Sequence, residues 1–162
     1  MRLAPLLAIL SVAATQAPAP PVETAIERLA TCQDSWRDWK DNPAESKRVG
    51  ELFTGNFTQN KTNDGSFLPN TKILVVGLPV KRVYPESVGM GVGFSVILDG
   101  TFEVSRAHAE QAIGKKLGKC ETSDGMHTCE LEIAKERTIT LLAGEHDERH
   151  ETLLGCYYLY EK

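Results

Sequence analysis

Alternating apolar and polar positions run through the middle and the C-terminal third of the chain. The clearest alternation covers Val88–Leu98, and shorter ones cover Thr138–Ala143 and Thr152–Tyr160. Lys72–Tyr84 is rich in Ile and Val, but Pro79 interrupts it, and Phe53–Asn60 has the composition of an edge strand. Because period-two alternation is typical of half-buried strands, we expect these segments to form a sheet.

Two further segments have helical spacing. Apolar residues recur every three or four positions over Val22–Lys40, before Asn42-Pro43, and we expect Ser105 to cap a helix that runs to about Leu117. A short helical piece over Ala44–Leu52 is also expected. Strands joined as hairpins and interrupted by helices define the α+β class, so we predict an antiparallel sheet of about 5–7 strands covered by two helices.

The spacing of two cysteines predicts a disulfide across a hairpin. Asp124-Gly125 lies midway between Cys120 and Cys129, and Asp-Gly is a strong signal for a two-residue type I′ turn. Counting outward from that turn places the two cysteines opposite each other in a non-hydrogen-bonded pair, where a disulfide can form. Cys32 and Cys156 then pair by elimination.

Other roles for the cysteines fit the sequence less well. Structural zinc sites use closely spaced cysteine pairs, and redox-active pairs commonly form Cys-x-x-Cys; the chain has neither. Leu29-Ala30-Thr31-Cys32 loosely resembles a lipidation motif, but charged residues and prolines precede it in place of an apolar export segment. We therefore predict two structural disulfides.

The first residues have the plan of a secretory signal peptide. MRLAPLLAILSVAA gives one arginine, an apolar run and small residues, and cleavage after Ala14 is preferred to cleavage after Ala17 or Ala19, which would leave proline first. We predict a signal peptide over 1–14, a Pro/Ala linker over 15–21 and a single α+β domain over 22–162. The expected location is the periplasm or the exterior, where disulfides persist.

Composition narrows the class of function. The 162 residues are 41% hydrophobic and 25% charged, which are ordinary values for a globular protein, and the formal net charge is −4. An acidic chain without a basic cluster is not expected to bind nucleic acid. No second apolar run reaches the length of a membrane span, so we expect no transmembrane anchor. The sequence does not define an oligomeric state.

The most unusual candidate site is a row of small residues on one face of the Val88–Leu98 strand: Gly89, Gly91, Gly93 and Ser95. A strand face without side chains lets a helix, an aromatic ring or a ligand approach closely, and packing or sheet curvature is the commoner use. A ligand groove over these residues is therefore the alternative interpretation.

No set of residues predicts catalysis, a metal site or a cofactor. His146 and His150 are four residues apart but lie between strand-like runs, without the glutamate that a zincin has after its first histidine. Ser95 lacks the closing glycine of a nucleophile elbow. Asn56 and Asn60 begin glycosylation sequons, whose use depends on the host.

Three runs resemble those of a family of small exported bacterial proteins: GMGVGFSVILDG, CETSDGMHTCELE and TLLGCYYLYEK. This resemblance covers most of residues 72–162 and implies no activity. In architecture, a helix before a disulfide-closed hairpin and further strands is similar to one repeat of β-lactamase inhibitor protein and to small outer-membrane assembly lipoproteins. That second resemblance covers about Val104–Tyr160 and assigns no functional residue.

We therefore expect a non-enzymatic exported module that binds a protein or envelope partner. The alternative is a small-ligand carrier or hydrolase that uses a groove over Gly89–Gly93. A deep pocket with converging His or carboxylate side chains would favour the alternative. A filled glycine face together with an exposed tyrosine patch would favour partner binding.

Overall fold

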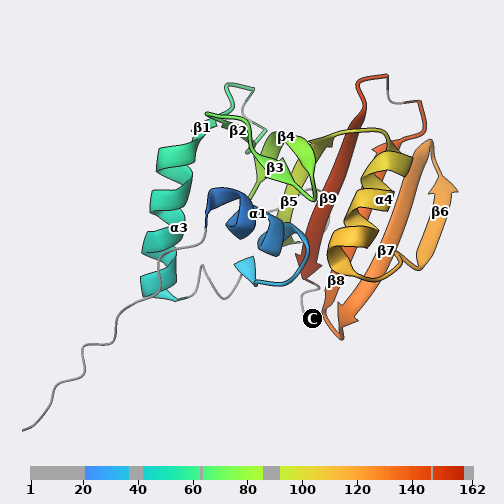
Figure 1. Cartoon of the computed structure of the whole chain (residues 1–162), viewed down its shortest axis with the longest axis horizontal. Coiled ribbons are helices and arrows are strands. Elements are labelled where there is room, and N and C mark those ends of the chain that lie inside the picture. The colour runs from blue at the N-terminus through green and yellow to red at the C-terminus, as the bar shows by residue number, and fades with distance from the viewer. Residues whose placement is uncertain (1–20, 37–41, 63, 86–91, 147, 159–162) are drawn as a thin grey trace, which may run out of the picture.

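One antiparallel sheet organises the chain (Figure 1). The computed structural model describes residues 21–36, 42–62, 64–85, 92–146 and 148–158. Within these residues the helices are α1 (Val22–Ala30), α3 (Pro43–Asn56) and α4 (Phe102–Ile113). The strands are β1 (Phe57–Gln59), β2 (Phe67–Pro69), β3 (Leu74–Val75), β4 (Leu78–Tyr84), β5 (Val92–Asp99), β6 (Lys119–Ser123), β7 (Met126–Ala134), β8 (Arg137–Gly144) and β9 (Glu151–Tyr158).

The strands follow the order β1-β2-β4-β5-β9-β8-β7-β6, and β3 pairs with β4. Every pairing is antiparallel, which confirms the predicted α+β class. The predicted number of strands is too low, because the described residues contain nine. Phe67–Pro69 and Leu74–Val75 account for part of the difference: the first lies in a turn-rich stretch and gains its strand pairing from β1 and β4.

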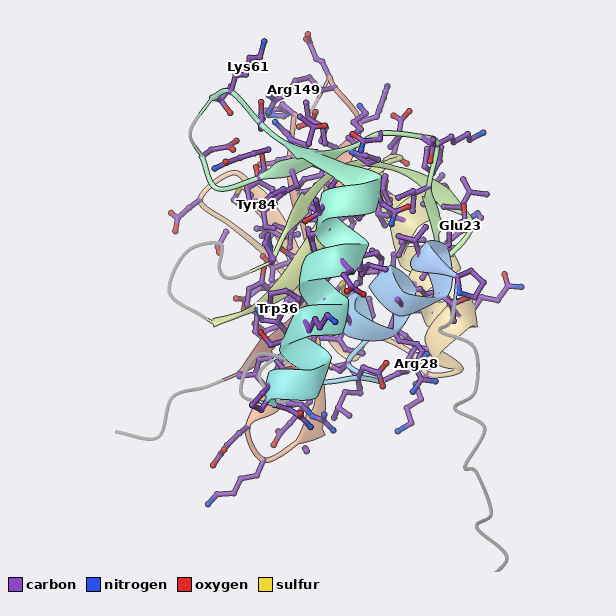
Figure 2. The ribbon with its side chains drawn as sticks, turned by 90° about the vertical axis from the view of Figure 1, so that its left-hand side faces the viewer. Glu23, Arg28, Trp36, Lys61, Tyr84 and Arg149 are labelled. Atoms are coloured by element: carbon purple, nitrogen blue, oxygen red, sulfur yellow. A yellow bond between two sulfur atoms is a disulfide. The ribbon has the colours of Figure 1, made fainter. Side chains whose placement is uncertain are left out.

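The helices do not cover the sheet as expected. Three helices are present among the described residues, and the third, α3, contains the short helical piece expected over Ala44–Leu52. Helix α1 contacts β3, β5 and β9, and α4 contacts β8 and β9. Helix α3 contacts β1 at the edge of the sheet (Figure 1), and its Phe53 belongs to the same core cluster as Ile26 and Leu29 of α1. In the turned view, Glu23 and Arg28 of α1 lie on one side and Tyr84 of β4 on the other (Figure 2). One face of the sheet therefore carries α1 and α4, and we call the other its open face.

The ends of the helices differ from the predicted ones, because side-chain bonds at the ends determine where each helix starts or stops. Helix α1 ends at Ala30 instead of continuing to Lys40, since Cys32 has a positive φ of 57° and is bonded to Cys156 in β9. Helix α3 continues through Phe53, which was expected in a strand. Helix α4 begins one turn early, because Thr101 Oγ1 accepts a hydrogen bond from the Val104 N–H (3.4 Å).

The core lies between the central strands and α1. Phe94, Val96 and Leu98 of β5 are fully buried, as the alternation predicted, and Ile26 and Leu29 of α1 belong to the same cluster. Trp36 adds to this core, with its ring centroid 5.5 Å from that of Phe94 and 5.8 Å from that of Phe53. Trp36 is therefore a packing residue and not an exposed stacking surface.

Both disulfides have the pairing that the sequence favoured. Cys120 lies opposite Cys129 in the β6–β7 hairpin, and Asp124 and Gly125 both have the positive φ that a type I′ turn requires. The second disulfide joins Cys32, just after α1, to Cys156 in the centre of β9. All four cysteines are therefore paired in disulfides in this structure.

The turn after α4 depends on one carboxylate. Glu110 accepts hydrogen bonds from Lys116 Nζ (2.6 Å), Arg106 Nε (3.0 Å) and the buried Leu117 N–H (3.1 Å). The hydrogen bond from Lys116 is the main cause that lowers the pKa of Glu110, and the bond from Arg106 acts in the same direction. Glu110 thereby fixes the connection from α4 to the disulfide hairpin.

We expect Glu110→Ala to lower the free energy of unfolding by about 1–3 kcal/mol, because it leaves the buried Leu117 N–H without its acceptor. The folded-state pKa lies below the unfolded one, so the stabilisation is complete above the ordinary carboxylate pKa and is lost as pH falls through the folded-state value. Urea unfolding of both proteins at neutral pH and at mildly acidic pH measures this. If the difference in unfolding free energy between the parent protein and Glu110→Ala grows on acidification, this role of Glu110 is contradicted.

Candidate functional site

Three aliphatic side chains form a row across the open face of the sheet. Ile97 in β5 is paired with Leu153 in β9, and Leu153 is paired with Leu142 in β8. Ile97 and Leu153 are only 8% and 5% exposed, yet neither belongs to the core cluster on the other face. Because neighbouring strands lie about 4.8 Å apart, the row extends roughly 10 Å across the sheet.

This row is the floor of a groove of about 670 Å³, which is larger than two other cavities, of about 200 and 280 Å³, over the described residues. Met126 of β7, which is 36% exposed, lines one end, and Arg82 of β4 lines the other. The connection between β8 and β9 forms one wall. We call this cavity the open-face groove. Its volume lies within the range of sites that bind small molecules or short segments of a partner.

The groove wall is held in place at both ends. The Glu145 N–H donates to Gly125 O (2.7 Å), next to Met126. At the other end, Lys81 Nζ donates to Arg149 O (2.7 Å), and the Gly100 N–H donates to His150 O (2.8 Å). Arg149 is labelled at the top of Figure 2, at this end of the molecule. The wall is therefore tied to β4, to the β5–α4 connection and to the β6–β7 turn.

Ion pairs within the protein offset part of the positive charge at the Arg82 end. Arg82 Nη2 lies 2.5 Å from Glu151 Oε2, and Arg149 Nη2 lies 3.9 Å from the same oxygen. Lys81 Nζ lies 3.1 Å from Asp99 Oδ1. Arg82 Nε is buried and has no hydrogen-bond partner among the described residues. This end of the groove thus consists of internal ion pairs.

The rim of the groove also carries two exposed carboxylates, those of Glu145 and Glu148. Within the described part of the chain, neither carboxylate makes a hydrogen bond or an ion pair. The groove therefore has an apolar floor, a basic end that is partly offset by ion pairs, and two carboxylates without a partner among the described residues.

The predicted glycine site lies beside this groove and not in it. Gly89 and Gly91 are outside the described residues, while Gly93 and Ser95 are both buried in β5. A Cβ on Gly93 would collide with the backbone carbonyl of Cys156, so β9 fills the space that the glycine leaves. Neither Gly93 nor Ser95 lines any of the three cavities found.

Tyr157 covers the small residues next to Gly93. A Cβ on Gly155 would lie 2.7 Å from the Ser95 Cβ and 3.0 Å from Tyr157 Cε2, so these side chains occupy the same part of the open face. Burial raises the pKa of the Tyr157 phenol, and a hydrogen bond with Ser95 opposes that rise. The described part of the glycine face is thus in use for packing.

The histidines do not assemble a catalytic or metal site. His146 lines the groove, whereas His150 lines a separate cavity of about 200 Å³ at the start of α4. His127 Nδ1 lies 2.8 Å from Thr122 Oγ1, and His108 Nδ1 lies 2.9 Å from Val76 O. Over the described ranges, no three His, Cys, Asp or Glu side chains come together as metal ligands would.

Adjacent apolar residues within strands are the sequence feature that corresponds to the groove floor. Ile97-Leu98, Leu141-Leu142 and Leu153-Leu154 are adjacent apolar pairs within strands. Successive strand residues point to opposite faces, so each pair places one aliphatic side chain on the open face. That these three residues form one row depends on strand pairings, which the sequence does not specify.

Comparison of the chain with protein-family models, with curated proteins and with solved structures finds no match. The proposal below therefore rests on the geometry of the open-face groove. Within the described residues, no helix has both the length and the apolar content needed to cross a membrane.

Proposed function

We propose that this protein is an exported, non-enzymatic module that binds a segment of a protein or envelope partner in the open-face groove. The observation that carries the proposal is the row formed by Ile97, Leu153 and Leu142, which is apolar and lies outside the core. Ile97 and Leu153 are already nearly buried, so the apolar surface that a partner would remove from water is that of Leu142 and Met126.

The proposed location follows from the disulfides and the leader. Two formed disulfides are compatible with an extracytoplasmic protein, because reducing compartments seldom preserve them. We propose export through the signal peptide over 1–14, to the periplasm or the exterior. Mass spectrometry of the mature protein from its own host tests this proposal. The measured mass should match a chain that begins at Thr15, and a mass that includes residues 1–14 would contradict export by this route.

The alternative is a small-ligand carrier or hydrolase that uses a groove over Gly89–Gly93, and Gly93 lines none of the three cavities described above. The open-face groove, at about 670 Å³, is the cavity whose volume would accommodate such a ligand. Native mass spectrometry of the protein from its own host separates the two functions. A constant added mass of a few hundred daltons, on the order of a drug-sized ligand, would favour the carrier. A partner chain retained at stoichiometric amounts would favour the module.

Site-specific photo-crosslinking in the host tests partner binding. A photoreactive residue in place of Met126 should form one major protein adduct, because Met126 lies at the exposed end of the groove. Leu68 in β2 is the matched control, since it is also an exposed aliphatic residue (40%) but does not line the groove. Equal adducts at both positions, or none at Met126, would contradict the proposal.

A further inference from the structure

We infer that the segment bound in the open-face groove combines aliphatic side chains with lysine or arginine. This inference rests on the proposed function and specifies the chemistry of the partner. The apolar floor alone would accept any aliphatic segment, so the distribution of charge around the groove decides which segment fits.

The charged side chains that line the groove are net acidic, because three glutamates (Glu145, Glu148 and Glu151) face two arginines (Arg82 and Arg149). Glu151 accepts from Arg82 and lies 3.9 Å from Arg149, so it offsets part of the charge of the two guanidinium groups. Lys81 is paired with Asp99 and also donates to the Arg149 carbonyl. A carboxylate on a ligand would have to compete with these existing pairs.

Two of the acidic side chains of the groove have no ion-pair partner among the described residues. Glu145 and Glu148 are exposed and line the groove, and their carboxylates make no hydrogen bond or ion pair within the described chain. The Glu145 N–H is bonded to Gly125 O, which places this residue at the Met126 end. A cationic side chain at that end would gain attraction without breaking any interaction of the free protein.

The apolar floor and the acidic rim together specify an occupant. Aliphatic side chains would rest on Ile97, Leu153 and Leu142, while a neighbouring lysine or arginine would extend to Glu145 or Glu148. Exposed ion pairs contribute little individually, about 0.2–1 kcal/mol each, so we expect burial of the exposed apolar surface of Leu142 and Met126 to supply most of the affinity and the rim to select the partner.

Short peptides with blocked ends test the inference on the mature, disulfide-bonded protein. One peptide alternates leucine with lysine, a second alternates leucine with glutamate, and a third alternates serine with lysine. Fluorescence anisotropy gives the affinities, and methyl chemical shifts of Ile97, Leu142 and Leu153 locate binding in the groove. We expect the leucine–lysine peptide to bind about tenfold more tightly than the leucine–glutamate peptide, and the serine–lysine peptide not to bind.

A charge-neutral variant adds a matched control. Glu145→Gln with Glu148→Gln should weaken the leucine–lysine peptide about three- to tenfold and reduce its salt dependence. The control variant, Glu51→Gln with Glu103→Gln, removes two negative charges at positions outside the groove. It should change neither the affinity for the leucine–lysine peptide nor its salt dependence. If both leucine peptides bind alike, or the groove variant keeps its affinity, the inference is wrong and the proposed function stands. If neither leucine peptide binds, the proposed function itself fails.

Discussion

Replacing Cys32 and Cys156 together by alanine is expected to lower the free energy of unfolding by about 4–5 kcal/mol. This disulfide joins residues 124 positions apart, so it restricts nearly the whole described chain in the unfolded state. It also ties the end of α1 to the centre of β9, where Cys156 is fully buried. The loss is a large part of the 5–15 kcal/mol that is typical of a domain.

The second disulfide provides the matched comparison. Cys120 and Cys129 are nine positions apart, and Cys120 lies on the exposed edge strand β6. Their joint replacement by alanine should cost about 2–3 kcal/mol, since the closed loop is short. Urea unfolding of the two double variants and of the parent protein measures both effects. Equal losses, or a greater loss from the hairpin variant, would contradict this account.

Gly93→Ala should be the most destabilising single change at the predicted glycine site, at about 3 kcal/mol or more. The added Cβ would meet the backbone carbonyl of Cys156, and a backbone atom cannot move aside as a flexible side chain can. Because β5 and β9 are paired over eight positions around this point, the strain would spread along the central ladder. We expect thermal unfolding at a markedly lower temperature.

Gly118→Ala is the control for that substitution. Gly118 is exposed, and a Cβ added there would have no atom within 4 Å. Its free energy of unfolding should change by less than about 0.5 kcal/mol. If Gly93→Ala were as mild as Gly118→Ala, the space beside Gly93 would be open, and the alternative of a ligand groove over Gly89–Gly93 would gain support.

Local signals in the sequence predicted the parts of the fold that short-range chemistry controls. Asp124-Gly125 defines its own turn, and the spacing of Cys120 and Cys129 then determines the hairpin register that the structure has. The alternation around Phe94 likewise identified the face of β5 that packs on the core. In these cases the residues that determine the local structure lie close together in the sequence.

The parts that were missed depend on contacts between distant segments. Helix α1 ends at Ala30 because Cys32 bonds to a strand more than a hundred residues away. The open-face groove requires Ile97 of β5 to meet Leu153 of β9. An adjacent apolar pair indicates that a strand has two apolar faces, but only the strand order brings those faces together.

The central claim is that the aliphatic floor of the open-face groove holds the partner. Its most direct test is the photo-crosslink at Met126, measured in the Leu142→Asp background and in the Leu74→Asp background. Leu74 is an exposed aliphatic residue of β3 (37%) outside the groove, and circular dichroism of each variant verifies folding. We predict that Leu142→Asp abolishes the adduct and that Leu74→Asp leaves it unchanged. An adduct that persists in folded Leu142→Asp would contradict the account.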